Sequence, residues 1–228
     1  MASPAAYQPP TIEASWGAFV AHIPTLLVIW LLSSLFSGLG LLAMLAIQAG
    51  GLGLALWGQS AEAGSSLTTA LAQLGQVPFA ILAGLVGVLF TAVPALYYAT
   101  GEVITAKGAI RELLRRPGRY LLAGVLFGVV TTVGTLLCVL PGVAMLLVMP
   151  VYVNLIFTGD RPILDAFQAS FQVCYGTPQG RSFLLVELLT WLVVISVSLC
   201  TCFVGGLVAG PMGHFYLQNA AYQRGVLR

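Results

Sequence analysis

Long apolar runs restrict this chain to one class of fold. A helix that crosses a bilayer needs about 20 consecutive apolar residues, and charged residues make up 7% of the chain, against roughly 25% in soluble domains. Six runs approach or reach that length, at residues 23–45, 77–99, 120–139, 143–157, 182–200 and 203–222. The sequence therefore predicts an all-α fold, a polytopic membrane helix bundle with six transmembrane helices.

The placement of basic residues tests this prediction, because hydropathy alone defined the six runs. There are nine: Lys107, Arg111, Arg115, Arg116, Arg119, Arg161, Arg181, Arg224 and Arg228. All nine fall between runs 2 and 3, between runs 4 and 5, or at the C-terminus, and six spans put these segments on one side. The positive-inside rule makes that side cytoplasmic, with both termini there. The alternative is four spans with re-entrant hairpins, since runs 4 and 6 are the weakest.

The domain organisation follows from the same pattern. Residues 1–10 are rich in Pro and Ala and are expected to be disordered, while residues 11–228 form a single six-span domain. Amphipathic helices in the cytoplasmic interface are predicted at 12–20, 103–114 and 163–175, with a turn into the membrane at Pro24. On the opposite side, residues 59–69 are predicted to form a polar loop, followed by a small amphipathic helix around residues 67–74.

Three prolines suggest a threefold hairpin repeat. Pro94, Pro150 and Pro211 each lie inside an even-numbered run, and each odd-numbered run follows a predicted interfacial helix. The repeating unit would be an interfacial helix, an outgoing span and a returning span with proline. The alternative is that proline is simply tolerated in spanning helices, where neighbours satisfy the freed carbonyl.

The most specific stretch covers residues 139–170, which read VLPGVAMLLVMPVYVNLIFTGDRPILDAFQAS. A Pro-Gly turn, a second proline, an acidic turn and an Ala-x-x-x-Ser step (Ala166, Ser170) follow one another. This pattern resembles a bacterial group of uncharacterised six-span proteins, which includes the membrane domain fused to some glycerophosphodiester phosphodiesterases. The resemblance implies the fold and a bacterial inner-membrane location. It implies little chemistry, because the group is mostly without assigned activity, and the phosphodiesterase activity is not carried over to a chain without that soluble domain.

Polar residues inside the predicted spans are the first candidate site. Glu187 is the only acidic residue there, and ionisable groups at depth are functional candidates by default. Asn154 and His214 also lie in the inner halves of their spans, so the three could form one polar cluster. The structural alternative is that Glu187 snorkels or pairs with Arg181 while the other two satisfy kinked backbone.

Two further groups of residues are candidates. A basic cluster is expected to attract anionic lipid headgroups, or only to orient the chain: Lys107, Arg111, Arg115, Arg116 and Arg119. Cys138, Cys200 and Cys202 fall near predicted outer turns, where a disulfide from Cys138 to either of the others is allowed; free cysteines are the alternative. Cys174 is expected on the reducing side. No metal or cofactor motif appears, and a net charge of +2 does not suggest a nucleic-acid partner.

These features leave three functional hypotheses. The first is a non-enzymatic integral membrane protein, a structural or accessory subunit or scaffold whose partners are membrane lipids and other membrane subunits or copies of itself. The alternative is a transporter or channel-like protein for lipid or a small solute, based on broken helices and polar residues at depth. The third is an intramembrane enzyme acting on lipid, with Glu187 and His214 as an acid/base pair.

Overall fold

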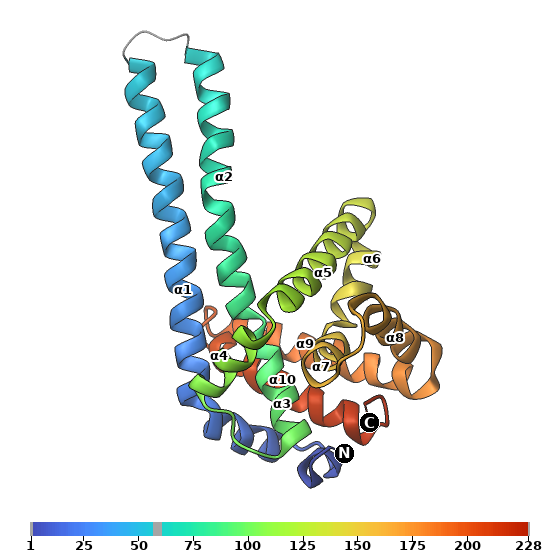
Figure 1. Ribbon diagram of the computed structural model, residues 1–228. Coiled ribbons are helices and arrows are strands. Elements are labelled where there is room, and N and C mark those ends of the chain that lie inside the picture. The colour runs from blue at the N-terminus through green and yellow to red at the C-terminus, as the bar shows by residue number, and fades with distance from the viewer. Residues whose placement is uncertain (1, 57–60, 228) are drawn as a thin grey trace. The chain divides into compact units, whose positions relative to one another are not determined.

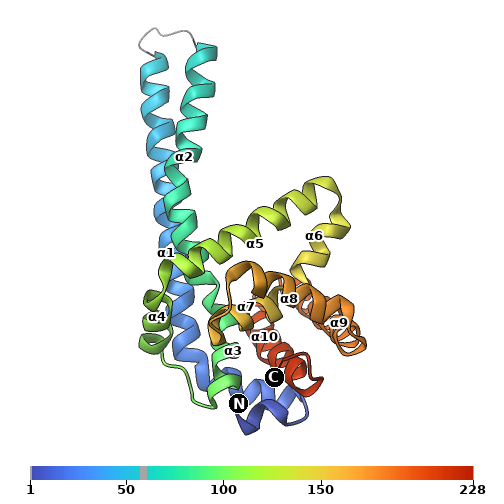
Figure 2. The same cartoon turned by 45° about the vertical axis from the view of Figure 1, so that its right-hand side comes forward.

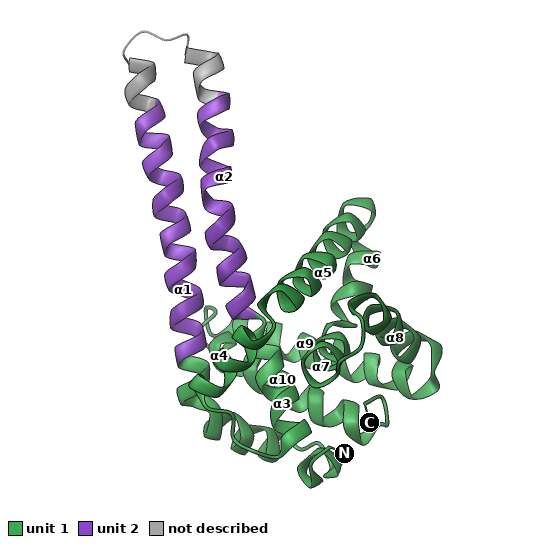
Figure 3. Cartoon of the chain, in the orientation of Figure 1, with its two compact units in different colours: residues 1–27, 88–228 green, residues 28–87 purple. Residues whose placement is uncertain are grey.

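The computed structural model describes residues 2–56 and 61–227, and every regular element in those two ranges is helical (Figure 1). The elements are η1 (Pro4–Tyr7), α1 (Ile12–Leu56), α2 (Ala61–Gly87), α3 (Leu89–Thr100), α4 (Ala106–Arg115), α5 (Pro117–Leu137), α6 (Val139–Leu146), α7 (Met149–Thr158), α8 (Ile163–Gly176), α9 (Pro178–Cys200) and α10 (Gly206–Gln223). They divide into two compact units, residues 28–87 and residues 1–27 with 88–228 (Figure 3).

Several helices are suited to a membrane. Within the described residues, four stretches are long and apolar enough to cross a bilayer: Ile12–Gly51, Ser66–Thr100, Pro117–Leu137 and Pro178–Cys200. A fifth arises if α6 and α7, which meet at a bend of 40°, are counted as one broken span. The predicted sixth run forms α10, which is not among the helices that meet both conditions. The chain is thus an all-helical protein with four to five candidate spans.

The unit of residues 28–87 is an antiparallel pair formed by α1 and α2 (Figure 3). Gly40 and Gly75 allow the close approach, since a Cβ at Gly40 would lie 3.0 Å from the Cβ of Phe79 and one at Gly75 would meet the side chain of Ile47. The predicted polar loop is largely absent, because residues 61–69 belong to α2, as does the predicted helix at 67–74. Residues 57–60 lie outside the described residues.

Helix α1 continues through Pro24, where the sequence predicts a turn between an interfacial helix and a span. Two residues near the proline, His22 and Thr25, form hydrogen bonds with the backbone of Ile104 in the loop before α4. His22 Nε2 accepts a hydrogen bond from the amide of Ile104 at 3.1 Å, and Thr25 Oγ1 donates to the carbonyl of Ile104 at 2.8 Å. These contacts support the helix where proline removes a backbone hydrogen bond.

The core of the other unit is formed by α3, α7 and α10, which pack against one another (Figures 1 and 2). Each of them contains one of the three prolines, Pro94 in α3, Pro150 in the first turn of α7 and Pro211 in α10. The ends of α3 and α7 also correspond, because Thr100 and Thr158 each donate to the carbonyl four residues earlier. The three helices that each contain one of these prolines therefore pack together at the centre of this unit.

Helices α5 and α6 form an antiparallel hairpin, residues 117–146, which we call the α5–α6 arm (Figures 1 and 2). The chain reverses at Cys138, whose backbone is extended, whereas the sequence predicts the turn at Pro141 and Gly142; both of these lie inside α6. The arm closes tightly because Gly134 has no side chain: a Cβ there would lie 3.3 Å from the amide nitrogen of Gly142.

Residues 2–10, for which composition predicts disorder, contact α3 and α10. Ser3 Oγ donates to the carbonyl of Tyr98 at 2.9 Å. The side-chain amide of Asn219 lies 3.1–3.2 Å from the carbonyl oxygens of Ala5, Ala6 and Gln8. The short apolar segment η1 is held on α3 and α10 because a buried amide satisfies its backbone carbonyls, a contact between residues more than 200 positions apart.

Candidate functional site

The three predicted polar residues separate into two groups. Asn154 Nδ2 donates to Gln218 Oε1 at 3.0 Å and to the hydroxyl of Tyr222 at 3.2 Å. Gln218 Nε2 in turn donates to the carbonyl of Pro150 at 2.8 Å. Asn154, Gln218 and Tyr222 are all buried. This amide network joins α7 to α10 and contains neither Glu187 nor His214.

Glu187 and His214 are brought together by one aromatic ring. Trp191, one turn after Glu187 on α9, is close enough to interact with the carboxyl group, and its ring packs edge-on to His214 with centroids 5.2 Å apart. The Glu187 side chain is fully buried, and neither carboxyl oxygen has a hydrogen bond of ordinary geometry among the described residues. His214 Nδ1 faces the hydroxyl of Thr91 at 3.5 Å. The Glu187–His214 pair predicted from the sequence is therefore indirect.

The ion pair suggested between Glu187 and Arg181 does not form among the described residues, whose ion pairs are Arg115–Glu112 and Arg116–Asp160. Arg181 instead donates from Nε to the carbonyl of Tyr175 at 2.9 Å. An acid/base pair needs its groups within hydrogen-bond reach, and the indole of Trp191 contacts both Glu187 and His214 instead. Trp191 on α9 therefore lies between the Glu187 carboxyl group and the His214 ring on α10.

The cysteines are free thiols within the described part of the chain. Cys138, Cys200 and Cys202 are exposed, and the disulfide that the sequence allows is not formed. Cys174 is buried at the end of α8. Burial, helped by the nearby Glu187 carboxyl, raises the pKa of its thiol to about 12. Among the described residues, no group of three His, Cys, Asp or Glu side chains is arranged to hold a metal ion.

The basic cluster is divided between an exposed stripe and structural contacts. Thr105 caps α4 by accepting from the amide of Gly108 at 3.2 Å. Lys107, Arg111 and Arg115 follow at four-residue spacing along one exposed face of α4, whereas Ala109 and Leu113 are buried. The predicted headgroup site thus has an amphipathic helix to present it.

Arg116 and Arg119 make contacts at the C-terminal end of α7 and in the loop that follows it. Arg116 pairs with Asp160, and the guanidinium holds the pKa of that exposed carboxyl below its ordinary value. Arg119 Nη2 donates to the carbonyls of Gly159 at 3.1 Å and Ile156 at 3.5 Å. The cation therefore satisfies carbonyls at the C-terminal end of α7, where the helix dipole also favours it.

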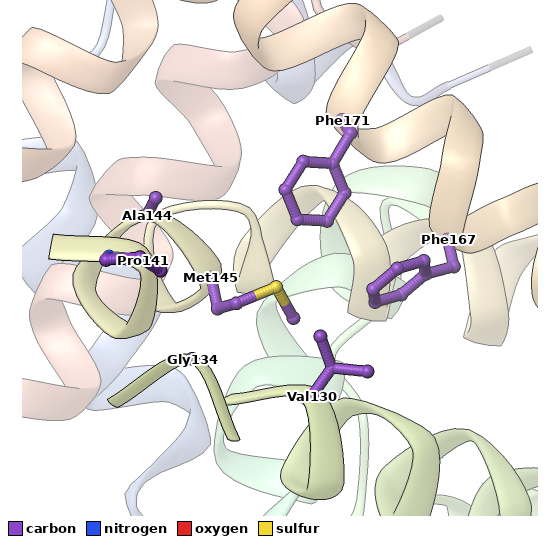
Figure 4. A pocket seen from close by; sticks show the side chains of 7 residues that line it. All are labelled: Val130, Gly134, Pro141, Ala144, Met145, Phe167 and Phe171. Carbon is purple, nitrogen blue, oxygen red and sulfur yellow. The ribbon is translucent and has the colours of Figure 1, made fainter. Parts of the chain in front are cut away.

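An apolar pocket, unrecognised from the sequence, lies between the α5–α6 arm and α8 (Figure 4). Its volume is about 350 Å³. The lining side chains come from α5 (Val130, Gly134), α6 (Pro141, Ala144, Met145) and α8 (Phe167, Phe171). Figure 4 shows the Met145 thioether between Val130 and the two phenylalanine rings. The sequence signal for this pocket is the aromatic spacing of α8, where Phe167, Phe171 and Tyr175 recur every four residues. The Phe167 and Phe171 rings are tilted against each other, and the Phe171 and Tyr175 rings are stacked.

Comparisons with known proteins identify no relative. No family model matches the chain, and no match was found among curated proteins or solved structures. The resemblance of residues 139–170 to bacterial six-span proteins therefore stays a prediction.

Proposed function

We propose that the chain is a non-enzymatic, multi-pass membrane protein that serves as a structural or accessory subunit of a membrane assembly. The observation behind this proposal is the amide pair of Asn154 and Gln218, 3.0 Å apart and buried between α7 and α10. Asn219 and His22 likewise bind backbone groups of distant segments. These buried amides and the imidazole thus connect distant parts of the chain to one another.

We also propose a six-span topology in a bacterial inner membrane, with both termini cytoplasmic. The bent pair α6–α7 would be the fourth span and α10 the sixth. The basic residues support this arrangement, because six spans place all nine on one side. The packing of α3, α7 and α10 supports the threefold hairpin repeat, since each would be the returning span of its unit.

The test replaces Glu187 and His214, the two ionisable side chains that a reaction or a transport cycle would use. Glu187→Leu combined with His214→Phe should leave the native complex of the chain unchanged on blue-native electrophoresis of detergent-solubilised membranes. The same variant should complement a deletion strain as the wild type does. Asn154→Leu combined with Gln218→Leu is the matched structural variant and should reduce the amount of complex. Loss of complementation by the first variant, with normal insertion and complex size, would refute the proposal.

A transporter or channel-like protein for lipid or a small solute is the second candidate. The bend of 40° between α6 and α7 favours it, because broken helices build transport sites. Lipid scrambling in reconstituted vesicles, measured with a fluorescent lipid and an impermeant quencher, tests it directly. If the wild-type chain scrambles lipid and Glu187→Gln abolishes this activity, the protein is a transporter and the structural proposal is wrong.

A further inference from the structure

The pocket under the α5–α6 arm is held open at two points. The hydroxyl of Tyr152 donates to the carbonyl of Ala123 on α5 at 3.1 Å. The hydroxyl of Tyr175 donates to the carbonyl of Ala144 on α6 at 2.8 Å. Each tyrosine comes from outside the arm, so the two phenols set its distance from α7 and α8. Collapse of the arm onto α8 would break these hydrogen bonds, and a pocket of about 350 Å³ lies between the arm and α8.

The lining decides what can enter this cavity. A buried water needs two to four polar partners, and all seven lining residues have apolar side chains or none. The volume lies at the lower end of the range of small-molecule sites, about 300–1,000 Å³. In a bilayer the abundant apolar material is the lipid acyl chain, which gains the same close contacts as a core side chain. The apolar lining therefore favours an alkyl chain over water.

Arg181 is linked to the pocket lining through one residue, Tyr175. Tyr175 contacts the pocket wall at Ala144 through its hydroxyl, and its backbone carbonyl accepts from Nε of Arg181 at 2.9 Å. One tyrosine thus separates the guanidinium of Arg181 from the lining of the pocket. Arg181 is exposed and has no carboxylate partner among the described residues. Arginine binds phosphate in a bidentate manner, so this position suits an anionic headgroup.

We propose that the pocket beneath the α5–α6 arm binds an anionic phospholipid, with one acyl chain between Met145 and the α8 phenylalanines and the phosphate on Arg181. This site is separate from the basic stripe of α4 and does not depend on the structural role proposed above. A lipid in this position fills the space that the two tyrosines keep between the arm and α8.

The experiment uses the full chain in nanodiscs that contain photoactivatable phosphatidylglycerol or phosphatidylcholine, each with a diazirine on one acyl chain. Mass spectrometry then maps the labelled residues. Labelling should concentrate on Met145, Phe167 and Phe171 relative to exposed Leu140, and phosphatidylglycerol should exceed phosphatidylcholine several-fold. Ala144→Phe fills the pocket and should abolish labelling there, whereas its neighbour Val143→Phe, which does not line the pocket, should leave labelling intact.

Charge variants test the headgroup position. Arg181→Gln should lower the preference for phosphatidylglycerol about tenfold, the factor expected for one charge-assisted hydrogen bond. Arg181→Lys should retain most of the preference for phosphatidylglycerol. Arg161, an exposed arginine in the loop between α7 and α8, is the matched control, and Arg161→Gln should leave this preference unchanged. Thermal unfolding of each variant in detergent separates a misfolded variant from one that lacks only the site. Equal labelling of Leu140 and Met145, no effect of Ala144→Phe, or crosslinks from the pocket to a second copy of the chain would overturn the proposal.

Discussion

Gly180 and Cys174 bring the first turn of α9 against the last turn of α8 with no room for a side chain between them. A Cβ on Gly180 would lie 2.7 Å from the Cα of Cys174 and would also meet the carbonyl of Val173. Because the opposing atoms belong to the backbone, they cannot rotate away as a side chain would. The junction of α8 and α9 therefore depends on glycine at this position.

Gly180→Ala should lower the free energy of unfolding by about 1–3 kcal/mol, the range for overpacking a close contact. Thermal or SDS-induced unfolding in detergent micelles measures the change. Gly176→Ala is the matched control, since a Cβ there meets no atom within 4 Å and its backbone is not left-handed. Equal stability of the two variants would show that the α8–α9 approach is looser than described.

Asn154→Leu should destabilise the chain by about 0.5–2 kcal/mol, because it leaves Gln218 Oε1 and the Tyr222 hydroxyl without their buried donor. The Asn154→Leu/Gln218→Leu double variant should be less destabilised than the sum of the single variants. Unfolding in detergent gives all four values of the cycle, and Gln168→Leu on the exposed face of α8 is the control. Additive effects would mean that the two amides do not interact.

Arg119→Gln should destabilise the chain by about 1–2 kcal/mol, because the carbonyls of Ile156 and Gly159 lose a charged donor. Arg116→Gln should have little effect, since its pair with Asp160 is exposed and screened by water. The same unfolding assay compares the two arginines. A larger loss at Arg116 would contradict the assignment of Arg119 as the residue that caps α7.

Cys174 predicts a pH dependence on the alkaline side. Burial and the Glu187 carboxyl raise the pKa of the folded thiol to about 12, so between its ordinary value of 9.0 and 12 only the unfolded chain loses this proton. The unfolded state then binds fewer protons, and stability falls as pH rises through that window. Cys174→Ala should show a shallower fall. Native Cys174 should also resist iodoacetamide at pH 8 while unfolded Cys174 reacts, and rapid native alkylation would contradict its burial.

The proposed topology predicts which thiols can be reached from outside the cell. A membrane-impermeant maleimide added to intact cells should label the exposed Cys138, Cys200 and Cys202 but not Cys174. A cysteine introduced at exposed Arg111 should react only after the membrane is permeabilised. Each thiol is tested alone in a background without the others. Labelling of the Arg111→Cys variant in intact cells would reverse the assigned orientation.

The amino-acid sequence predicts where the helices lie better than it predicts which helices are neighbours. The predicted helices at 103–114 and 163–175 and the run at 182–200 correspond to α4, α8 and α9 to within four residues at each end, because amphipathic spacing and hydropathy are local signals. The continuity of α1 through Pro24 was missed, since it depends on contacts with Ile104, which lies about 80 residues away.

In the candidate site, too, the sequence predicts which residues are buried but not which of them are in contact. His214 and Gln218 lie one turn apart on α10, yet His214 faces Thr91 and Trp191 while Gln218 faces Asn154. Hydropathy indicates that such residues are deep in the bundle, but helix rotation and the choice of neighbour decide which of them meet. The pocket was missed for a related reason, because it arises from the distance that two tyrosine side chains set between the arm and the core.

The contact of Asn219 with residues 5–8 has a consequence for biosynthesis. The ribosome makes Ala5, Ala6 and Gln8 first and reaches their partner more than 200 residues later, which takes at least about ten seconds at roughly 5–20 residues per second. During that interval the first segment has no docking site, and the earlier helices are inserted without it. Closure of the N-terminal segment onto α10 is therefore a late event in assembly, and a nascent chain that stalls before Asn219 leaves its own beginning unbound and accessible to proteases.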